Sequence, residues 1–191
     1  MTVDPIDIAL LVARAIEQVG GEYFVGGSLA SSFQGEPRAT NDIDMVVKIP
    51  LGKTSEFIAS LGADFEVDLD TLRDALIQRR SCNIFFLPLV TKIDLFAVGT
   101  TPYDEIEFAR RKAVRVRDSN ETLVLKTPED TVLRKLLWYR EGGEVSEKQW
   151  RDLTQVLRIS RDVIDLEYIT SWADRLGLTT LLARARSEVA R

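Results

Sequence analysis

The spacing of hydrophobic positions changes along the chain and divides it into two parts. Up to about residue 126, short apolar runs typical of strands alternate with stretches in which apolar side chains recur every three or four residues. From residue 127 onward only the second, helical spacing is found. The pattern predicts a mixed α/β portion over residues 1–126 and a helical region over residues 127–191 that packs on it.

The first portion is predicted to begin with a helix whose apolar stripe runs from Ile8 to Val19 and which ends at Gly20. Residues 83–89 and 92–98 are predicted to pair as an antiparallel hairpin that turns at residues 88–91. The other expected elements are strands near residues 23–25, 42–49, 65–67, 113–117 and 122–126, and helices near residues 28–33, 51–61, 71–78 and 102–110.

The second portion opens with a helix-start signal. Thr127 is a favourable N-cap, Pro128 suits the first helical position, and Glu129 and Asp130 place negative charge in the first turn. Three further helices are expected around residues 150–157, 166–176 and 178–191.

The composition is that of an ordinary globular protein, with 191 residues of which 45% are hydrophobic and 29% charged. No apolar run approaches the ~18 residues that a transmembrane helix needs. The N-terminal stretch carries Asp4 and Asp7 and lacks the basic start of a signal peptide. The expected location is the cytoplasm, with no membrane partner.

The sequence contains no histidine and a single cysteine, Cys82. Hydrolysis by a Ser-His-Asp triad, Cys-His nucleophiles and histidine-ligated metals are therefore excluded. One cysteine also excludes an internal disulfide, and its apolar neighbours favour a buried structural thiol. Any chemistry has to use carboxylates, hydroxyls, lysine, arginine and cations that bind oxygen.

Acidic residues recur with strand spacing at two places. Because successive side chains of a strand point to opposite faces, Asp42 and Asp44 share one face, and so do Lys92 and Asp94. If the two strands are neighbours, three carboxylates converge. Such a cluster is costly unless protons or a divalent cation offset the charge. Aspartate oxygens are preferred ligands of Mg²⁺, which recruits phosphates as further ligands.

A glycine turn precedes the first acidic pair. Gly26 and Gly27 lie between a predicted strand and a predicted helix, where backbone can approach a phosphate closely. The N–H groups at the helix start and the Ser28 hydroxyl can then donate to that phosphate. Gly27 and Ser28 followed by Asp42, Asp44 and a later Asp94 form a more specific pattern than two glycines alone.

These motifs resemble the DNA polymerase β-like nucleotidyltransferase superfamily. Its signature is a hydrophobic residue with Gly-Gly/Ser, an acid–hydrophobic–acid segment and a third acid on a later strand, which match Gly27–Ser28, Asp42–Ile43–Asp44 and Asp94. The Arg-Ala-Thr-Asn stretch at residues 38–41 and TPEDTVLRKLLWYR at residues 127–140 are similar to small bacterial members of the abortive-infection and toxin–antitoxin types. The resemblance covers residues 20 to about 160. It implies an α+β nucleotidyltransferase fold, with a mixed β-sheet flanked by helices and a C-terminal helical tail.

The resemblance also implies a mechanism. Asp42 and Asp44 would hold the Mg²⁺ or Mn²⁺ that carries a nucleoside triphosphate such as ATP. With Asp94 they would hold a second metal that activates an acceptor hydroxyl, and Asp94 or a base near it would help to deprotonate that hydroxyl. Gly27 and Ser28 would cradle the β- and γ-phosphates.

Three cations are candidate phosphate contacts, and two of them, Arg38 and Lys92, have a simpler alternative. Arg38 is either a phosphate ligand or an ordinary loop arginine. Lys92 either contacts phosphate or forms an ion pair with Asp94. Lys135 would reach the phosphates from the solvent face of its helix.

The acceptor is open among tRNA, a protein and a small molecule. A net charge of −5 disfavours a large RNA, whereas Arg110, Arg111, Lys112, Arg115 and Arg117 keep a basic stripe available. Phosphatases with an Asp-x-Asp motif fit less well, because their apolar strand precedes the acids, whereas here the apolar run follows them and no Gly-Thr turn comes after. Glycosyltransferases with a metal-binding Asp-x-Asp would lack the preceding Gly-Gly-Ser and the third acid. The remaining alternative is a non-catalytic nucleotide-binding regulatory or antitoxin-like protein, with a partner protein encoded nearby.

Overall fold

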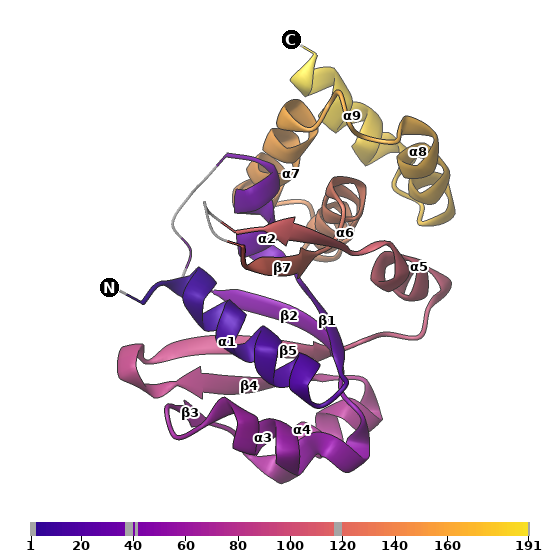
Figure 1. The fold of residues 1–191 in the computed structure, drawn as a ribbon. Coiled ribbons are helices and arrows are strands. Elements are labelled where there is room, and N and C mark those ends of the chain that lie inside the picture. Colours follow the sequence, from indigo (N-terminus) through magenta and orange to yellow (C-terminus); the bar gives the residue numbers. More distant parts are fainter. Residues whose placement is uncertain (1–2, 37–39, 41, 117–119, 191) are drawn as a thin grey trace. The chain divides into compact units, whose positions relative to one another are not determined.

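The computed structural model describes residues 3–36, 40, 42–116 and 120–190 (Figure 1). The chain forms two compact units, which are described separately. One contains Met1–Leu29 and Ala39–Leu125, and the other contains Ala30–Arg38 and Lys126–Arg191. The predicted mixed α/β architecture with C-terminal helices is confirmed. None of the helices in the described parts of the chain has both the length and the apolar character needed to cross a membrane.

The first unit is built on a mixed sheet of strand order β3-β4-β5-β2-β1-β7-β6. β2 pairs in parallel with β5, and β1 with β7, whereas the other neighbours are antiparallel. The strands are β1 (Glu22–Val25), β2 (Ile43–Lys48), β3 (Phe65–Glu66), β4 (Ser81–Phe86), β5 (Thr91–Ala97), β6 (Lys112–Arg115) and β7 (Thr122–Leu125).

Alternation along the central strands produces one buried and one open face. Ile43 and Met45 of β2 and Ile93 of β5 are fully buried, and α1 (Pro5–Gln18), α3 (Thr54–Leu61) and α4 (Leu69–Gln78) pack on this side (Figure 1). The residues between them, including Asp44 and Asp94, point to the opposite face. Around Asp44 and Asp94 this face is partly exposed, whereas at β1 it is covered, because Phe24 is buried against Phe108 of α5 (Pro102–Arg110).

The expected hairpin is confirmed, since β4 and β5 pair antiparallel with Phe86 opposite Thr91. Its turn is a short 3₁₀ helix, η2 (Leu87–Leu89), followed by Val90 with a positive φ of 49°. A second 3₁₀ helix, η1 (Leu51–Lys53), precedes α3, and α5 (Pro102–Arg110) follows β5.

The second unit is helical and contains α6 (Pro128–Glu141), α7 (Glu147–Ile159), α8 (Leu166–Arg175) and α9 (Thr179–Val189). α6 packs on α7 and α8, and α9 packs on α7 and α8. The N-terminus of α6 is capped as expected, because Asp130 donates its backbone N–H to the Thr127 hydroxyl at 3.3 Å. The remaining helix, α2 (Gly27–Gln34), contains the boundary between the two units.

Candidate active site

Asp44 and Asp94 lie side by side in the middle of the sheet. β2 and β5 run parallel, and the register places Asp44 opposite Asp94. Paired residues of neighbouring strands point to the same face, so the two carboxylates share the open face of the sheet. Both side chains are partly exposed. The carboxylates were expected to converge only if their two strands are neighbours, and β2 and β5 are neighbours.

The glycine turn at Gly26 and Gly27 is hydrogen-bonded to β2, the strand that carries Asp44. The backbone N–H of Gly26 donates to the carbonyl of Asp44 at 2.8 Å. Gly27 has a positive φ of 55°, and a Cβ at this position would lie 2.6 Å from Cγ of Asp44. Only glycine allows both the backbone conformation and this close approach. The turn is therefore pressed directly against the Asp44 side chain.

The first turn of α2 begins at this contact. Gly27 is the first residue of the helix, and Ser28 is its second and is buried. Helix N-termini present unsatisfied N–H groups and a partial positive charge, which favour anions such as phosphates. The start of α2 and the carboxylate of Asp44 thus meet at one point of the first unit.

The sequence predicted Asp42 inside a strand over residues 42–49, but β2 begins at Ile43, so Asp42 stands just before it. Its backbone N–H donates to the hydroxyl of Thr40 at 3.2 Å, and its side chain is exposed.

Lys92 forms an ion pair with Asp94, with 2.8 Å between Nζ and Oδ2. The hydrogen bond and the charge of Asp94 raise the pKa of the Lys92 ammonium, and the negative charges of Asp42 and Asp44 raise it further. The ammonium therefore lies within the electrostatic reach of all three acids. Of the two readings of Lys92, the structure shows the ion pair, and a phosphate contact stays a prediction.

Asn83 is a residue of this face that the sequence patterns missed. It lies on β4 opposite Asp94, so Asp44, Asp94 and Asn83 form a row across three strands. On the other side of Asp44, the turn that follows β1 adjoins this row, because the Gly26 N–H donates to the Asp44 carbonyl. The expected hairpin did not identify it, because a turn at residues 88–91 would pair Asp94 with Phe85, whereas the observed pairing of Phe86 with Thr91 places Asn83 there.

The donor set suits a hard divalent cation. Within the described ranges, no three acidic or thiol side chains are gathered closely enough to form a ready-made metal site. The face nonetheless offers carboxylate oxygens from adjacent strands, which Mg²⁺ and Mn²⁺ prefer. The close approach of Gly27 places the N-terminus of α2 beside the Asp44 carboxylate. These residues therefore fit a metal that carries a phosphorylated ligand.

Lys135 corrects one expectation, because it does not lie on a solvent face. Its side chain is buried in the second unit, with Nζ 3.0 Å from Oδ2 of Asp152 and 3.0 Å from Oε1 of Gln149. Its helix is amphipathic, but this position belongs to the packed side that faces α7.

Arg38, another candidate phosphate contact, lies outside the described residues.

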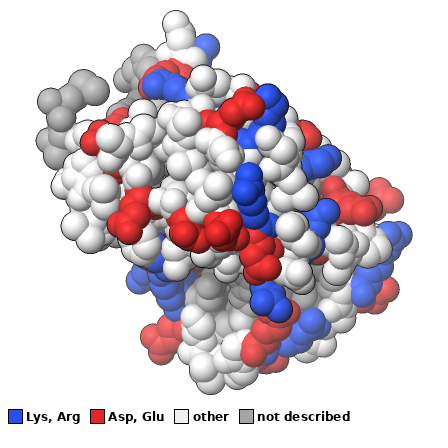
Figure 2. Space-filling view, turned by 90° about the horizontal axis from the view of Figure 1, so that it is seen from below, with Lys and Arg blue, Asp and Glu red and all other residues white. Residues whose placement is uncertain are grey.

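One member of the basic stripe, Arg111, is engaged in contacts within the first unit, whereas Lys112 and Arg115 are exposed. The Arg111 guanidinium pairs with Glu22, donates to the carbonyl of Phe108 at 2.6 Å and lies 4.2 Å from the centroid of the Phe108 ring. Arg117 lies outside the described residues. On the face shown in Figure 2, basic and acidic side chains are interspersed.

Cys82 is buried on β4, as expected. Burial raises the pKa of its thiol to about 11, and the charge of Asp94 adds to this shift. A thiol of this kind remains protonated and is a poor nucleophile.

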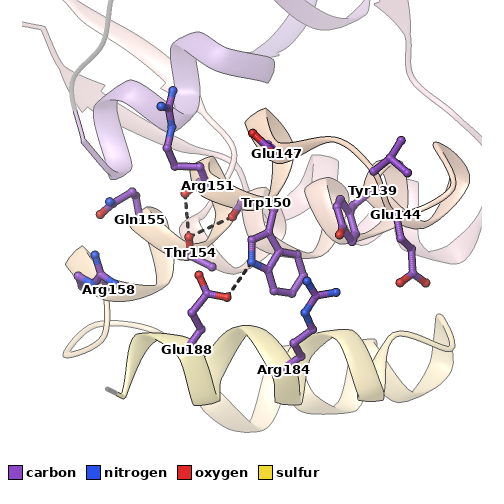
Figure 3. A pocket seen from close by; sticks show the side chains of 11 residues that line it. Tyr139, Glu144, Glu147, Trp150, Arg151, Thr154, Gln155, Arg158, Arg184 and Glu188 are labelled. Carbon is purple, nitrogen blue, oxygen red and sulfur yellow. Dashed lines mark hydrogen bonds between the residues drawn. The ribbon is translucent and has the colours of Figure 1, made fainter.

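The second unit has a hollow of its own, of about 580 Å³, between α7 and α9 (Figure 3). Trp150 is at its centre and donates from Nε1 to Oε2 of Glu188 at 2.9 Å. The Arg184 guanidinium lies 4.1 Å from the centroid of the Trp150 ring, and the Tyr139 ring packs 5.0 Å from it. These contacts are internal packing, and none of the sequence-predicted site residues lines this hollow.

The fold is similar to those of solved nucleotidyltransferase-like proteins. An antigenic nucleotidyltransferase-like protein from Paracoccidioides brasiliensis matches with a TM-score of 0.57 at 16% identity, over 96% of this chain and 93% of that one. The antibiotic-resistance factor ANT(2'')-Ia in solution matches with a TM-score of 0.52 at 13% identity, over 97% and 100% of the two chains. Its crystal structure in complex with adenylyl-2''-tobramycin matches with a TM-score of 0.51 at 14% identity, over 96% and 98%.

No protein-family model matches the sequence, and no curated protein does. At such low identities, the structural similarity establishes the fold. The nucleotidyltransferase fold that the sequence motifs imply is thereby confirmed.

Proposed function

We propose that this protein is a metal-dependent nucleotidyltransferase that moves a nucleoside monophosphate from a nucleoside triphosphate to an acceptor hydroxyl. The observation that carries the proposal is the contact of Gly27 with Asp44, which itself lies opposite Asp94. It joins a phosphate-binding helix start to a pair of carboxylates. The similarity to nucleotidyltransferase-like folds supports the same reading.

Asp42, Asp44 and Asp94 would hold Mg²⁺ or Mn²⁺. When bound, the divalent cation neutralises phosphate charge and lowers the pKa of an acceptor hydroxyl. The backbone N–H groups at Gly27 and Ser28 would bind the phosphates of the triphosphate. Lys92, Arg38 and Lys135 were candidates for further phosphate contacts; Lys92 is the one whose described position favours that role.

The reaction forms one bond and breaks one. The acceptor oxygen attacks the α-phosphorus, the bond between that phosphorus and the bridging oxygen to the β-phosphate breaks, and pyrophosphate leaves. The acceptor proton passes to Asp94 or to water. The work of the protein is positioning and charge compensation, which supply most of the rate enhancement in phosphoryl-group chemistry.

The proposed setting is the cytoplasm, as part of a toxin–antitoxin or phage-defence system with a partner protein encoded nearby. This part rests on the resemblance to small bacterial nucleotidyltransferases. The acceptor would come from one of three classes, tRNA, protein or small molecule. An experiment that supplies all three at once is therefore the appropriate test.

The test is incubation of the purified protein with cell extract, Mn²⁺ and nucleoside triphosphates labelled in either the α- or the γ-phosphate. The proposal expects label from the α-phosphate, and none from the γ-phosphate, to become attached to one species of the extract. Asp44→Asn should abolish this labelling. Asp74→Asn, an exposed acid of α4, is the matched control and should leave it intact.

Identical label patterns for wild type and Asp44→Asn would contradict catalysis at this site. If a triphosphate with metal raises the melting temperature of the wild type but no label is transferred to any species, the protein binds nucleotide without transferring it.

A further inference from the structure

Lys92 is a cation that forms an ion pair with one of the proposed metal ligands. It is on β5, two residues before Asp94, and the two side chains share the open face of the sheet. Its Nζ lies 2.8 Å from Oδ2 of Asp94. The Lys92 side chain is 46% exposed, and that of Asp94 is 17% exposed.

The ammonium also lies near the acids of the neighbouring strand. Ile43 is opposite Ile93 in the parallel ladder, so Asp42 and Lys92 each stand one residue before this pair. Asp44 follows one residue after Ile43 and is opposite Asp94. Lys92 is thus beside the corner where the three carboxylates are expected to meet, and its positive charge reduces their mutual repulsion.

Folding stability gives little reason for such a pair. Ion pairs with a half-exposed lysine are screened by solvent and contribute little to the free energy of unfolding. The Lys92 side chain is long and flexible, and its ammonium is a point charge that can move between carboxylate and phosphate oxygens. These properties suit an exchangeable partner of Asp94 better than a structural one.

We propose that Lys92 is the resident cation of the carboxylate site, which occupies Asp94 in the metal-free protein and has to release it before Asp94 binds a divalent cation. The inference rests on the proposed function and extends it. A triphosphate that arrives with the metal offers the released ammonium new anionic oxygens. Lys92 therefore makes metal binding weak in the absence of nucleotide and strong in its presence.

This arrangement is a coupling between two ligands. Because the coupling is reciprocal, the nucleotide should tighten Mn²⁺ binding by the same factor by which Mn²⁺ tightens nucleotide binding. Replacing Lys92 by a neutral residue removes the cation that competes with the metal for Asp94, and the same change removes the charge that would pair with the triphosphate. It should therefore strengthen metal binding without nucleotide and reduce the factor by which nucleotide strengthens it.

The experiment measures free Mn²⁺ by its electron paramagnetic resonance signal, with and without a non-hydrolysable α,β-methylene ATP analogue. Lys92→Met should bind Mn²⁺ roughly three- to tenfold more tightly than wild type when nucleotide is absent. Lys92→Arg keeps the charge and should resemble wild type. Lys48→Met is the matched control, because Lys48 is an exposed lysine of β2 whose partner is Glu22 at 3.7 Å.

Equal Mn²⁺ affinities for wild type and Lys92→Met, with binding abolished in Asp44→Asn, would overturn the inference and leave the proposed function standing. A Lys48→Met variant that gains affinity as much as Lys92→Met would also overturn it, since the effect would then be general charge. Absence of Mn²⁺ binding in every variant, even with the analogue, would overturn both the inference and the proposed metal site.

Discussion

Gly27 and Asp44 are in such close contact that a side chain at position 27 would have to displace the carboxylate. A Cβ built there would lie 2.6 Å from Cγ and 3.0 Å from Cβ of Asp44, and the φ of 55° is unfavourable for other residues. Gly26 holds the same turn through its N–H to the Asp44 carbonyl. The strand that carries the acid and the turn that would bind phosphate are therefore one structural feature.

Gly27→Ala should disrupt this feature. The left-handed backbone and the displaced carboxylate should together lower the free energy of unfolding by about 2 kcal/mol or more and abolish nucleotidyl transfer. Urea denaturation and α-phosphate labelling measure the two effects. Gly52→Ala is the control, since a Cβ there meets nothing within 4 Å, and it should cost no more than about 0.5 kcal/mol. Retention of full activity in Gly27→Ala would refute the role of this contact.

Asp44→Asn should separate activity from stability. The substitution preserves shape but removes one of two carboxylates that face each other across β2 and β5. We expect transfer to fall at least about a hundredfold, while the free energy of unfolding stays within about 0.5 kcal/mol of wild type or rises. Thermal denaturation without metal provides the comparison. A loss of stability of more than about 2 kcal/mol would show instead that the Asp44 carboxylate is structural.

Tyr23 predicts a dependence of stability on alkaline pH. Burial raises its pKa from 10.0 to about 12, although the N–H of Val124, which donates to its hydroxyl at 3.3 Å, acts in the opposite direction. The unfolded chain therefore releases this proton at lower pH than the native protein does. The contribution of Tyr23 is complete below pH 10 and is lost as the pH rises toward about 12.

The measurement is the urea unfolding free energy of wild type and Tyr23→Phe between pH 9 and pH 11. The variant should be less sensitive to pH than wild type over this range. Parallel curves for the two proteins would contradict the assignment of the alkaline loss to Tyr23.

Lys135 predicts a stability defect that the loss of its partner repairs. Lys135→Met should remove the ion-pair partner of the buried Asp152 carboxylate, and should cost about 3 kcal/mol. The double variant Lys135→Met/Asp152→Leu should recover most of this loss, because the buried charges are removed together. Denaturation of the single and double variants tests the pair.

The same double variant tests the predicted phosphate contact. If Lys135 only supports the second unit, a refolded double variant should keep the wild-type KM for the triphosphate. A KM that stays raised although stability is restored would show that Lys135 binds phosphate.

The sequence predicted the elements of this site more completely than their contacts. Alternation placed Asp44 and Asp94 on strand faces, and the hairpin of β4 and β5 was expected, because both depend on local patterns. The parallel pairing of β2 with β5 joins residues fifty positions apart in the chain, and no hydrophobic periodicity indicates it. For this reason the meeting of Asp44 with Asp94 was only a conditional expectation. Asn83 was missed for another reason, since the register of the β4–β5 hairpin differs from the one that the expected turn gives.

Two other features depend on packing that a sequence does not display. The requirement for glycine at position 27 comes from the Asp44 side chain of another strand, and not from the turn alone. The face on which Lys135 lies is decided by Asp152 and Gln149 of α7, which bury the lysine on a side of α6 that the helical pattern alone left open. The sequence therefore predicted candidate residues for the site, and the tertiary contacts show which of them lie beside the carboxylates.

The most direct measurement is a crystal structure of the protein with Mn²⁺ and α,β-methylene ATP, in which the metal is located by its anomalous scattering. The account predicts a manganese peak against the carboxylates of Asp44 and Asp94, with the phosphates at the first turn of α2 beside Gly27 and Ser28. A manganese peak or a nucleotide bound away from these residues would contradict it.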